Sequence, residues 1–124
     1  MRRSGTRALR TIAIDGKVYR YRVTWRPIED VTTFSAFDPE VPRAPVRFRF
    51  PEGPEHGAGP IFEDGVVGDR REPKWSLNLH RPRTAEFLIR LALRHGWAGR
   101  ELVIENAYDF LRAHAQPIAA LTAP

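Results

Sequence analysis

The stretch ALRTIAIDGKVYRYRVTWR, residues 8–26, decides the fold of this protein. Asp15-Gly16 favours a two-residue type I′ loop, and β-branched and aromatic residues flank it on both sides. If these two residues form the loop, Ile14 faces Lys17 and Ile12 faces Tyr19 across a β-hairpin. Because side chains alternate between the faces of a strand, one face is apolar, with Ile12, Ile14, Tyr19, Tyr21, Val23 and Trp25. The other face carries Arg20, Arg22, Thr24 and Arg26.

The same alternation returns further along the chain. Residues 46–50, VRFRF, predict a strand with its apolar side chains inward and Arg47 and Arg49 outward. Residues 75–80, WSLNLH, predict another, with His80 on the outer side. Residues 31–37 predict a further strand, although their alternation is poorer. Clean alternation is typical of an antiparallel sheet with one face in water.

A change of period after residue 80 predicts two helices. Apolar residues dominate positions 84–95, where only a narrow polar stripe remains and Gly96 ends the helix. A helix this apolar is expected to be buried on more than one side. Residues 101–105 predict a short strand, and Asn106 is the expected N-cap of a last helix that runs to about residue 115, with Asp109 near its start.

These elements predict an α+β fold with an antiparallel sheet of four to five strands and two C-terminal helices packed on one face. A chain of 124 residues fits a single domain, residues 1–124. We expect residues 1–7 to form a disordered arm and residues 117–124 a loose tail. Residues 52–73 are rich in glycine, proline and acidic residues and predict one long loop.

Composition excludes several classes of protein. The chain has no cysteine, which excludes disulfides, thiolate zinc sites and cysteine nucleophiles and fits a cytoplasmic protein. No signal peptide or membrane anchor is apparent. The net charge of +5 is uneven, with +7 for residues 1–26, −6 for 27–69 and +4 for 70–124. The acidic middle could neutralise part of the basic surface, so net charge alone is a weak sign of a polyanionic partner.

The outward arginines and the histidine at the end of the 75–80 strand are the candidate binding residues: Arg20, Arg22, Arg26, Arg47, Arg49 and His80. Guanidinium groups pair bidentately with phosphates and carboxylates, so this face could dock nucleic acid or an acidic protein surface. The other interpretation is a solvated sheet face paired with the acidic middle segment, because an alternating strand must place polar residues on its solvent side. The sequence leaves both interpretations open.

Other function classes receive less support from the residues. Sheet-type binders of single-stranded nucleic acid stack bases on outward aromatic side chains, whereas the strand aromatics here are expected to point inward. The glycines of residues 53–68 match no phosphate-binding loop, and the acidic residues near position 64 match no calcium loop. No catalytic residue, metal site or cofactor is predicted, although a small enzyme that uses His80 remains a minor alternative.

The expected function is that of a small, arginine-rich, cytoplasmic protein-binding module, immunity-like or adaptor-like, that binds an acidic protein surface. The alternative is a nucleic-acid-associated domain that contacts phosphates through the same arginines. The sequence pattern of residues 88–111, from LIR through HGW to IENAYDFL, resembles that of small bacterial proteins and implies a bacterial source. The apolar helix 84–95 would also suit a homodimer, and no membrane partner is expected.

Overall fold

The computed structural model describes residues 5–6, 9–53, 56–57, 65–72 and 74–115. A six-stranded sheet contains β1 (Gly5–Thr6), β2 (Arg10–Ile14), β3 (Lys17–Arg26), β4 (Val31–Phe37), β5 (Val46–Pro51) and β9 (Leu102–Ile104). A three-stranded sheet contains β6 (His56–Gly57), β7 (Val66–Asp69) and β8 (Trp75–Asn78). The helices are α1 (Pro82–Arg94) and α2 (Ala107–His114). The protein therefore belongs to the α+β class.

The β2–β3 hairpin has the predicted register. Ile12 pairs with Tyr19 and Ile14 with Lys17. Asp15 and Gly16 both have positive φ, at 52° and 81°, as a type I′ turn requires. The alternation also holds over most of β3, because Tyr19, Tyr21 and Val23 are buried while the arginines between them are partly or fully exposed.

The large sheet is mixed rather than purely antiparallel. Its order is β3-β4-β5-β9, with β1 and β2 both paired to β3. All of these pairs are antiparallel except β5–β9, in which Val46 lies beside Leu102 in a parallel ladder. The chain builds the small sheet and α1 between β5 and β9, and a crossover of that length allows β9 to return in the direction of β5.

The structure corrects three expectations about individual segments. The strand at 75–80 does not join the large sheet, because β8 pairs with β7 in the second sheet. The region 52–73 is not one continuous loop, since β6 and β7 form within it and pair with each other. In the expected arm 1–7, Gly5 and Thr6 form β1 against Trp25 and Thr24. The expected tail 117–124 lies outside the described residues.

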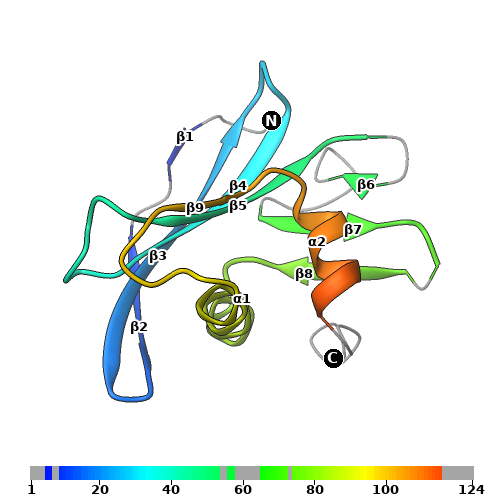
Figure 1. Ribbon diagram of the computed structural model, residues 1–124. Coiled ribbons are helices and arrows are strands. Elements are labelled where there is room, and N and C mark those ends of the chain that lie inside the picture. Colours follow the sequence, from blue (N-terminus) through cyan, green and yellow to red (C-terminus); the bar gives the residue numbers. More distant parts are fainter. Residues whose placement is uncertain (1–4, 7–8, 54–55, 58–64, 73, 116–124) are drawn as a thin grey trace.

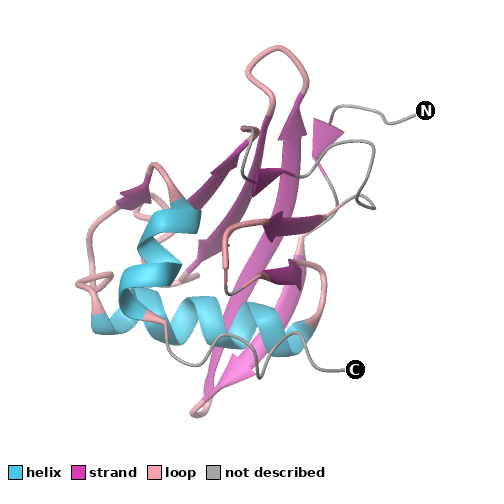
Figure 2. Cartoon of the chain, turned by 90° about the vertical axis from the view of Figure 1, so that its right-hand side faces the viewer, coloured by secondary structure: helices cyan, strands magenta, loops and turns pink. Residues whose placement is uncertain are grey.

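Both helices and the small sheet lie on one side of the large sheet (Figure 1). In the view turned by 90°, the long helix α1 runs across the long strands (Figure 2). Aromatic contacts join the layers: Phe48 of β5 meets Phe110 of α2 at 6.1 Å, and Trp75 of β8 meets Tyr108 of α2 at 5.8 Å between ring centroids. One hydrophobic cluster thus connects both sheets and both helices. The predicted placement of the helices opposite the arginines is confirmed.

The helix ends follow the expected signals. Pro82 lies in the first turn of α1, and Gly96, with a φ of 97°, follows its C-cap. The side chain of Asn106 accepts a hydrogen bond from the backbone N–H of Asp109 at 3.2 Å, so the predicted N-cap is confirmed. Most apolar side chains of α1 are buried within the chain, although Leu93 is exposed. The homodimer through this helix stays a prediction.

Gly65 provides a test of the packing between β7 and the turn after β8. It has a φ of 85°, and an added Cβ would lie 2.3 Å from the imidazole of His80. Gly65→Ala should therefore lower the free energy of unfolding by about 2 to 3 kcal/mol, through backbone strain and a clash with the ring. Gly16→Ala is the matched control, because Gly16 has a similar φ of 81° but no atom within 4 Å of the added Cβ.

The control should cost only about 1 kcal/mol, from strain alone. Urea denaturation of both variants measures the difference. Equal losses of stability in the two variants would show that the His80 ring moves aside without cost.

Candidate functional site

The outward positions of three adjacent strands form two cross-strand rows. Arg22 of β3 pairs with Ser35 of β4, which pairs in turn with Arg47 of β5. One step along the strands, Thr24, Thr33 and Arg49 form the second row in the same way. Because residues two apart share a face, the two rows bring arginines and hydroxyl groups together on the side of the sheet opposite the helices.

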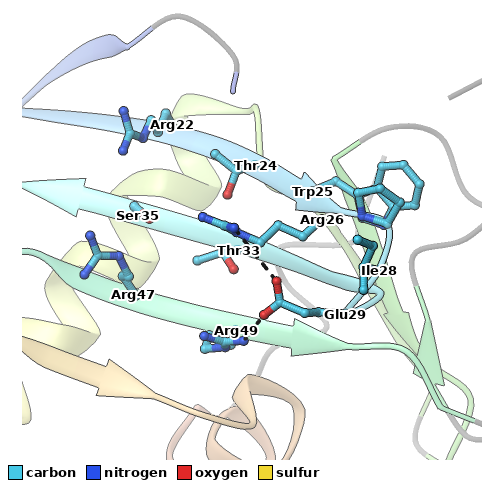
Figure 3. A pocket seen from close by; sticks show the side chains of 11 residues that line it. Arg22, Thr24, Trp25, Arg26, Ile28, Glu29, Thr33, Ser35, Arg47 and Arg49 are labelled. Carbon is cyan, nitrogen blue, oxygen red and sulfur yellow. Dashed lines mark ion pairs between the residues drawn. The ribbon is translucent and has the colours of Figure 1, made fainter. Parts of the chain in front are cut away.

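These rows line a concave region of about 480 Å³, which we call the arginine hollow. One wall is the end of β3 and the turn that follows it, residues 26–29. The lining residues are Arg22, Thr24, Trp25, Arg26, Pro27, Ile28, Glu29, Thr33, Ser35, Arg47 and Arg49. Figure 3 shows Arg22 and Arg47 on either side of Ser35, away from the end formed by Trp25 and Ile28. The hollow therefore has a basic end and an apolar end.

Three glutamates partly neutralise the arginines of this face. Glu29 lies 3.9 Å from Arg26 and 3.7 Å from Arg49. Glu101 and Glu105, which flank β9, approach Arg47 at 2.6 Å and Arg49 at 3.6 Å. All three glutamates are at least half exposed, so each pair contributes at most about 1 kcal/mol and can open readily. Five outward arginines against three glutamates leave a formal excess of two positive charges.

Arg22 differs from the other arginines of the hollow. No ion pair joins it to a carboxylate within the described residues, and its guanidinium lies 5.2 Å from the centre of the Phe37 ring. Its Nε is buried and has no hydrogen-bond partner there. Buried polar groups are rarely left unpaired. An anion that binds the terminal nitrogens of Arg22 would have no carboxylate of the described residues to displace.

The apolar end corrects one expectation. Trp25 was predicted to face the core, but it is only partly buried and lines the hollow beside Ile28 (Figure 3). The tip of the β3–β4 hairpin extends beyond both helices, so neither helix covers this end of the sheet (Figure 1). Ile28 is 98% exposed, which is unusual for a large apolar side chain.

The structure brings together four of the six candidate residues. Arg22, Arg26, Arg47 and Arg49 line the hollow. Arg20 lies on the same face but in the next row, opposite Phe37, and does not line it.

His80 does not lie with these arginines, and it does not line the hollow. Its carbonyl oxygen accepts hydrogen bonds from Arg10 at 3.2 Å and from the Tyr21 hydroxyl at 3.5 Å. Tyr21 points to the core side of β3, so His80 lies on the opposite side of the sheet from the hollow. The reason is that β8 belongs to the second sheet.

Sequence reasoning placed Thr24 on this face but missed the hydroxyls of β4 and the glutamates of this site. Alternation alone places Glu101 and Glu105 on the face of Val103, but only the pairing of Val103 with Arg47 shows that this is the arginine face. Ser35 and Thr33 lie in β4, where the alternation is poor because residues on both faces of this central strand are buried. No sequence pattern identified Glu29 or Ile28 as site residues, because the sequence shows only that they lie between two predicted strands.

A second cluster of charged residues, around Asp69, stabilises the fold. The Asp69 carboxylate is buried and accepts hydrogen bonds from Arg71 at 2.9 Å and from Arg112 at 2.7 Å. Arg71 also pairs with Asp109 at 2.9 Å. Burial acts to raise the pKa of Asp69, but the hydrogen bonds from the two arginines outweigh it and hold the pKa well below its usual range. The cluster ties β7 to α2 and leaves the carboxylate no capacity for a ligand.

Among the described residues, no three histidine, cysteine, aspartate or glutamate side chains gather in a group that could hold a metal ion. No helix in that part of the chain is long and apolar enough to cross a membrane. Comparison with known proteins adds no assignment: no family model matches the chain, and no curated protein or solved structure matches it.

Proposed function

We propose that this chain is a protein-interaction module whose arginine hollow binds an acidic segment of a partner protein. The observation that carries the proposal is the junction of a basic and an apolar end in one hollow, with Arg22 and Arg47 at one end and Trp25 and Ile28 at the other. An acidic side chain would pair with the guanidinium groups, and a neighbouring apolar side chain would contact Ile28.

The composition of the hollow supports a protein partner. Arginine and tryptophan are the residue types most enriched at the energetic centres of protein interfaces. Both line this hollow next to a fully exposed isoleucine. Burial of a large apolar side chain contributes about 1.5 to 3 kcal/mol, which an exposed Ile28 can supply only when a partner covers it.

The charges of the face favour a protein over nucleic acid. A phosphate backbone needs a continuous basic track, whereas Glu29, Glu101 and Glu105 interrupt this one. Phe37 shares the face but stacks with Arg22, which leaves Trp25 as the aromatic ring that borders the hollow. A single ring provides no platform for successive bases.

A photo-crosslinker in place of Ile28 tests the proposal. The variant Ile28→p-benzoylphenylalanine should fold normally, because Ile28 is 98% exposed. In a lysate of the organism that encodes the chain, it should crosslink to one protein through a peptide rich in aspartate or glutamate, identified by mass spectrometry. The same crosslinker at Val18, which is 51% exposed on β3 outside the hollow, is the matched control and should not capture that peptide.

Adding Arg22→Gln and Arg47→Gln to the Ile28 variant should reduce the crosslink at least about fivefold, because charge-assisted hydrogen bonds are lost. Arg94→Gln, an exposed arginine of α1, should leave it unchanged. Crosslinks that disappear after nuclease treatment would support the nucleic-acid alternative instead. Equal capture at positions 18 and 28 would refute the hollow as the binding site.

A further inference from the structure

We infer that the row Arg22–Ser35–Arg47 seats a phosphomonoester on a side chain of the partner protein. This inference rests on the proposed function and names the acidic group that the basic end of the hollow would recognise. It depends on three features of the row. These are the cross-strand geometry, the ion pair between Arg47 and Glu101, and the lack of a carboxylate partner for Arg22 within the described residues.

The geometry suits one tetrahedral anion. Ser35 lies on the middle strand, and the two arginines lie directly opposite it on the strands to either side. Neighbouring strands are about 4.8 Å apart, so the backbones that carry Arg22 and Arg47 are separated by about 10 Å. The two arginines lie on either side of Ser35 (Figure 3), and side chains of this length can turn toward a ligand above it. A hydroxyl and two guanidinium groups can then donate to the same anion.

The existing partner of Arg47 distinguishes a phosphate from a carboxylate. Glu101 already places a carboxylate oxygen 2.6 Å from Arg47 Nη1. A carboxylate from a partner protein would replace this group with an equal charge and little gain. A phosphomonoester carries a charge of about −1.5 to −2 at pH 7 and three strong acceptor oxygens, so it can displace Glu101 and bind all three donors together. Glu101 is 51% exposed and is free to turn into solvent.

Arg22 supplies a guanidinium that no carboxylate of the described residues occupies. Its guanidinium is held against Phe37 and has no carboxylate partner within the described residues. Orientation by the ring lowers the entropy lost when the guanidinium binds an anion. The buried Nε–H group of Arg22 also gives an NMR signal that reports binding, because a ligand on the terminal nitrogens of the same guanidinium changes its chemical shift.

The apolar end of the hollow indicates that the phosphate belongs to a protein. Trp25 and Ile28 border the same hollow as this row, in position to contact the residues next to a phosphorylated side chain. A nucleic-acid phosphodiester would bring a single negative charge and two free oxygens, which match the three donors less well. Clusters of arginine are a recurrent means of recognising phosphorylated side chains.

Titration with small ligands tests this phosphate-binding site directly. The full chain is titrated in low salt at pH 7 with N-acetyl-O-phosphoserine amide, N-acetylglutamic acid amide and dimethyl phosphate, and the Arg22 Nε–H and Ser35 N–H signals are followed by NMR. The phosphomonoester should shift both signals and bind at least about fivefold more tightly than the carboxylate or the diester, because of its higher charge. Lowering the pH from 7 to 5, across the second phosphate pKa of about 6, should weaken binding.

Matched variants assign the donors. Ser35→Ala removes the central hydroxyl alone, and Arg47→Gln removes one guanidinium; each should weaken phosphomonoester binding at least about threefold, as expected for a lost charge-assisted hydrogen bond. Arg94→Gln should bind as the unmodified chain does. Signal dispersion in the same spectra shows that each variant is folded.

The outcomes separate this inference from the proposed function. Equal affinity for the carboxylate and the phosphomonoester would refute phosphate recognition by this row, but it would remain consistent with an acidic protein partner. Tighter binding of the diester would replace a phosphoprotein with nucleic acid. An unmodified acidic peptide crosslinked at Ile28, with no response to the phosphomonoester, would refute this inference alone, whereas a phosphomonoester response with no protein crosslink would refute the protein partner.

Discussion

Replacement of Asp69 with asparagine is expected to lower the free energy of unfolding by about 3 kcal/mol at pH 7. The Asp69 side chain is fully buried between Arg71 and Arg112, so the substitution leaves two guanidinium groups facing a neutral amide. Removal of one partner from a buried ion pair costs about 3 to 5 kcal/mol, and the lower end applies because the arginines keep 30% and 23% of their side-chain surface exposed. Urea denaturation followed by tryptophan fluorescence measures the loss.

The contribution of Asp69 should also depend on pH in a defined direction. Because its pKa is held below the usual value, the carboxylate stabilises the folded state above the unfolded pKa of about 3.9, and this contribution falls as the pH is lowered further. The stability of the unmodified chain should therefore approach that of Asp69→Asn between pH 4 and pH 2. A constant difference over this range would contradict the assignment.

Asp109→Asn is the matched control for Asp69. Asp109 pairs with the same Arg71 at 2.9 Å, but its side chain is 60% exposed. Its loss should cost about 0.5 kcal/mol, the value typical of an exposed ion pair. If both variants lose the same stability, burial of the carboxylate is not the source of the effect.

Trp97→Ala is expected to cost about 4 kcal/mol, as is usual when a large buried aromatic residue is removed from a core. The indole is 3% exposed and lies 5.8 Å from the Tyr19 ring. Its Nε1–H donates to the carbonyl oxygen of Ala44 at 2.7 Å, which joins the segment after α1 to the segment before β5. The substitution leaves a cavity and an unsatisfied buried carbonyl.

Trp97→Phe separates these two contributions. Phenylalanine retains most of the apolar surface but cannot donate to Ala44, so this variant should lose about 1 to 2 kcal/mol. Thermal and urea unfolding of the two variants give the comparison. A loss in Trp97→Phe as large as that in Trp97→Ala would show that the hydrogen bond, rather than packing, holds these segments together.

Local patterns predicted the parts of the fold that depend on neighbouring residues. The Asp15-Gly16 turn determines which residues of β2 and β3 face each other, and the alternation then assigns their faces. The prediction failed for Trp25 at the strand end, where the chain extends past both helices. Strand alternation indicates an inner face only where other elements cover it.

Pairing between distant strands was not predictable in the same way. The pattern of β8 is as regular as that of β5, yet β8 pairs with β7, because a strand's own alternation does not specify its neighbour. The parallel return of β9 likewise depends on the path of the chain through the small sheet and α1. His80, which follows β8, lies on the other side of the large sheet from the arginines.

The sequence by itself determined the hairpin register, the separation of arginines from core aromatics over most of the sheet, and the helix cap at Asn106, because these follow from turn geometry, side-chain alternation and contacts within a few residues. Only the tertiary structure decided which arginines share a hollow, that Ser35 lies between Arg22 and Arg47, and that the glutamates flanking β9 reach Arg47 and Arg49. Those features depend on strand order, which is set by the packing of the whole core.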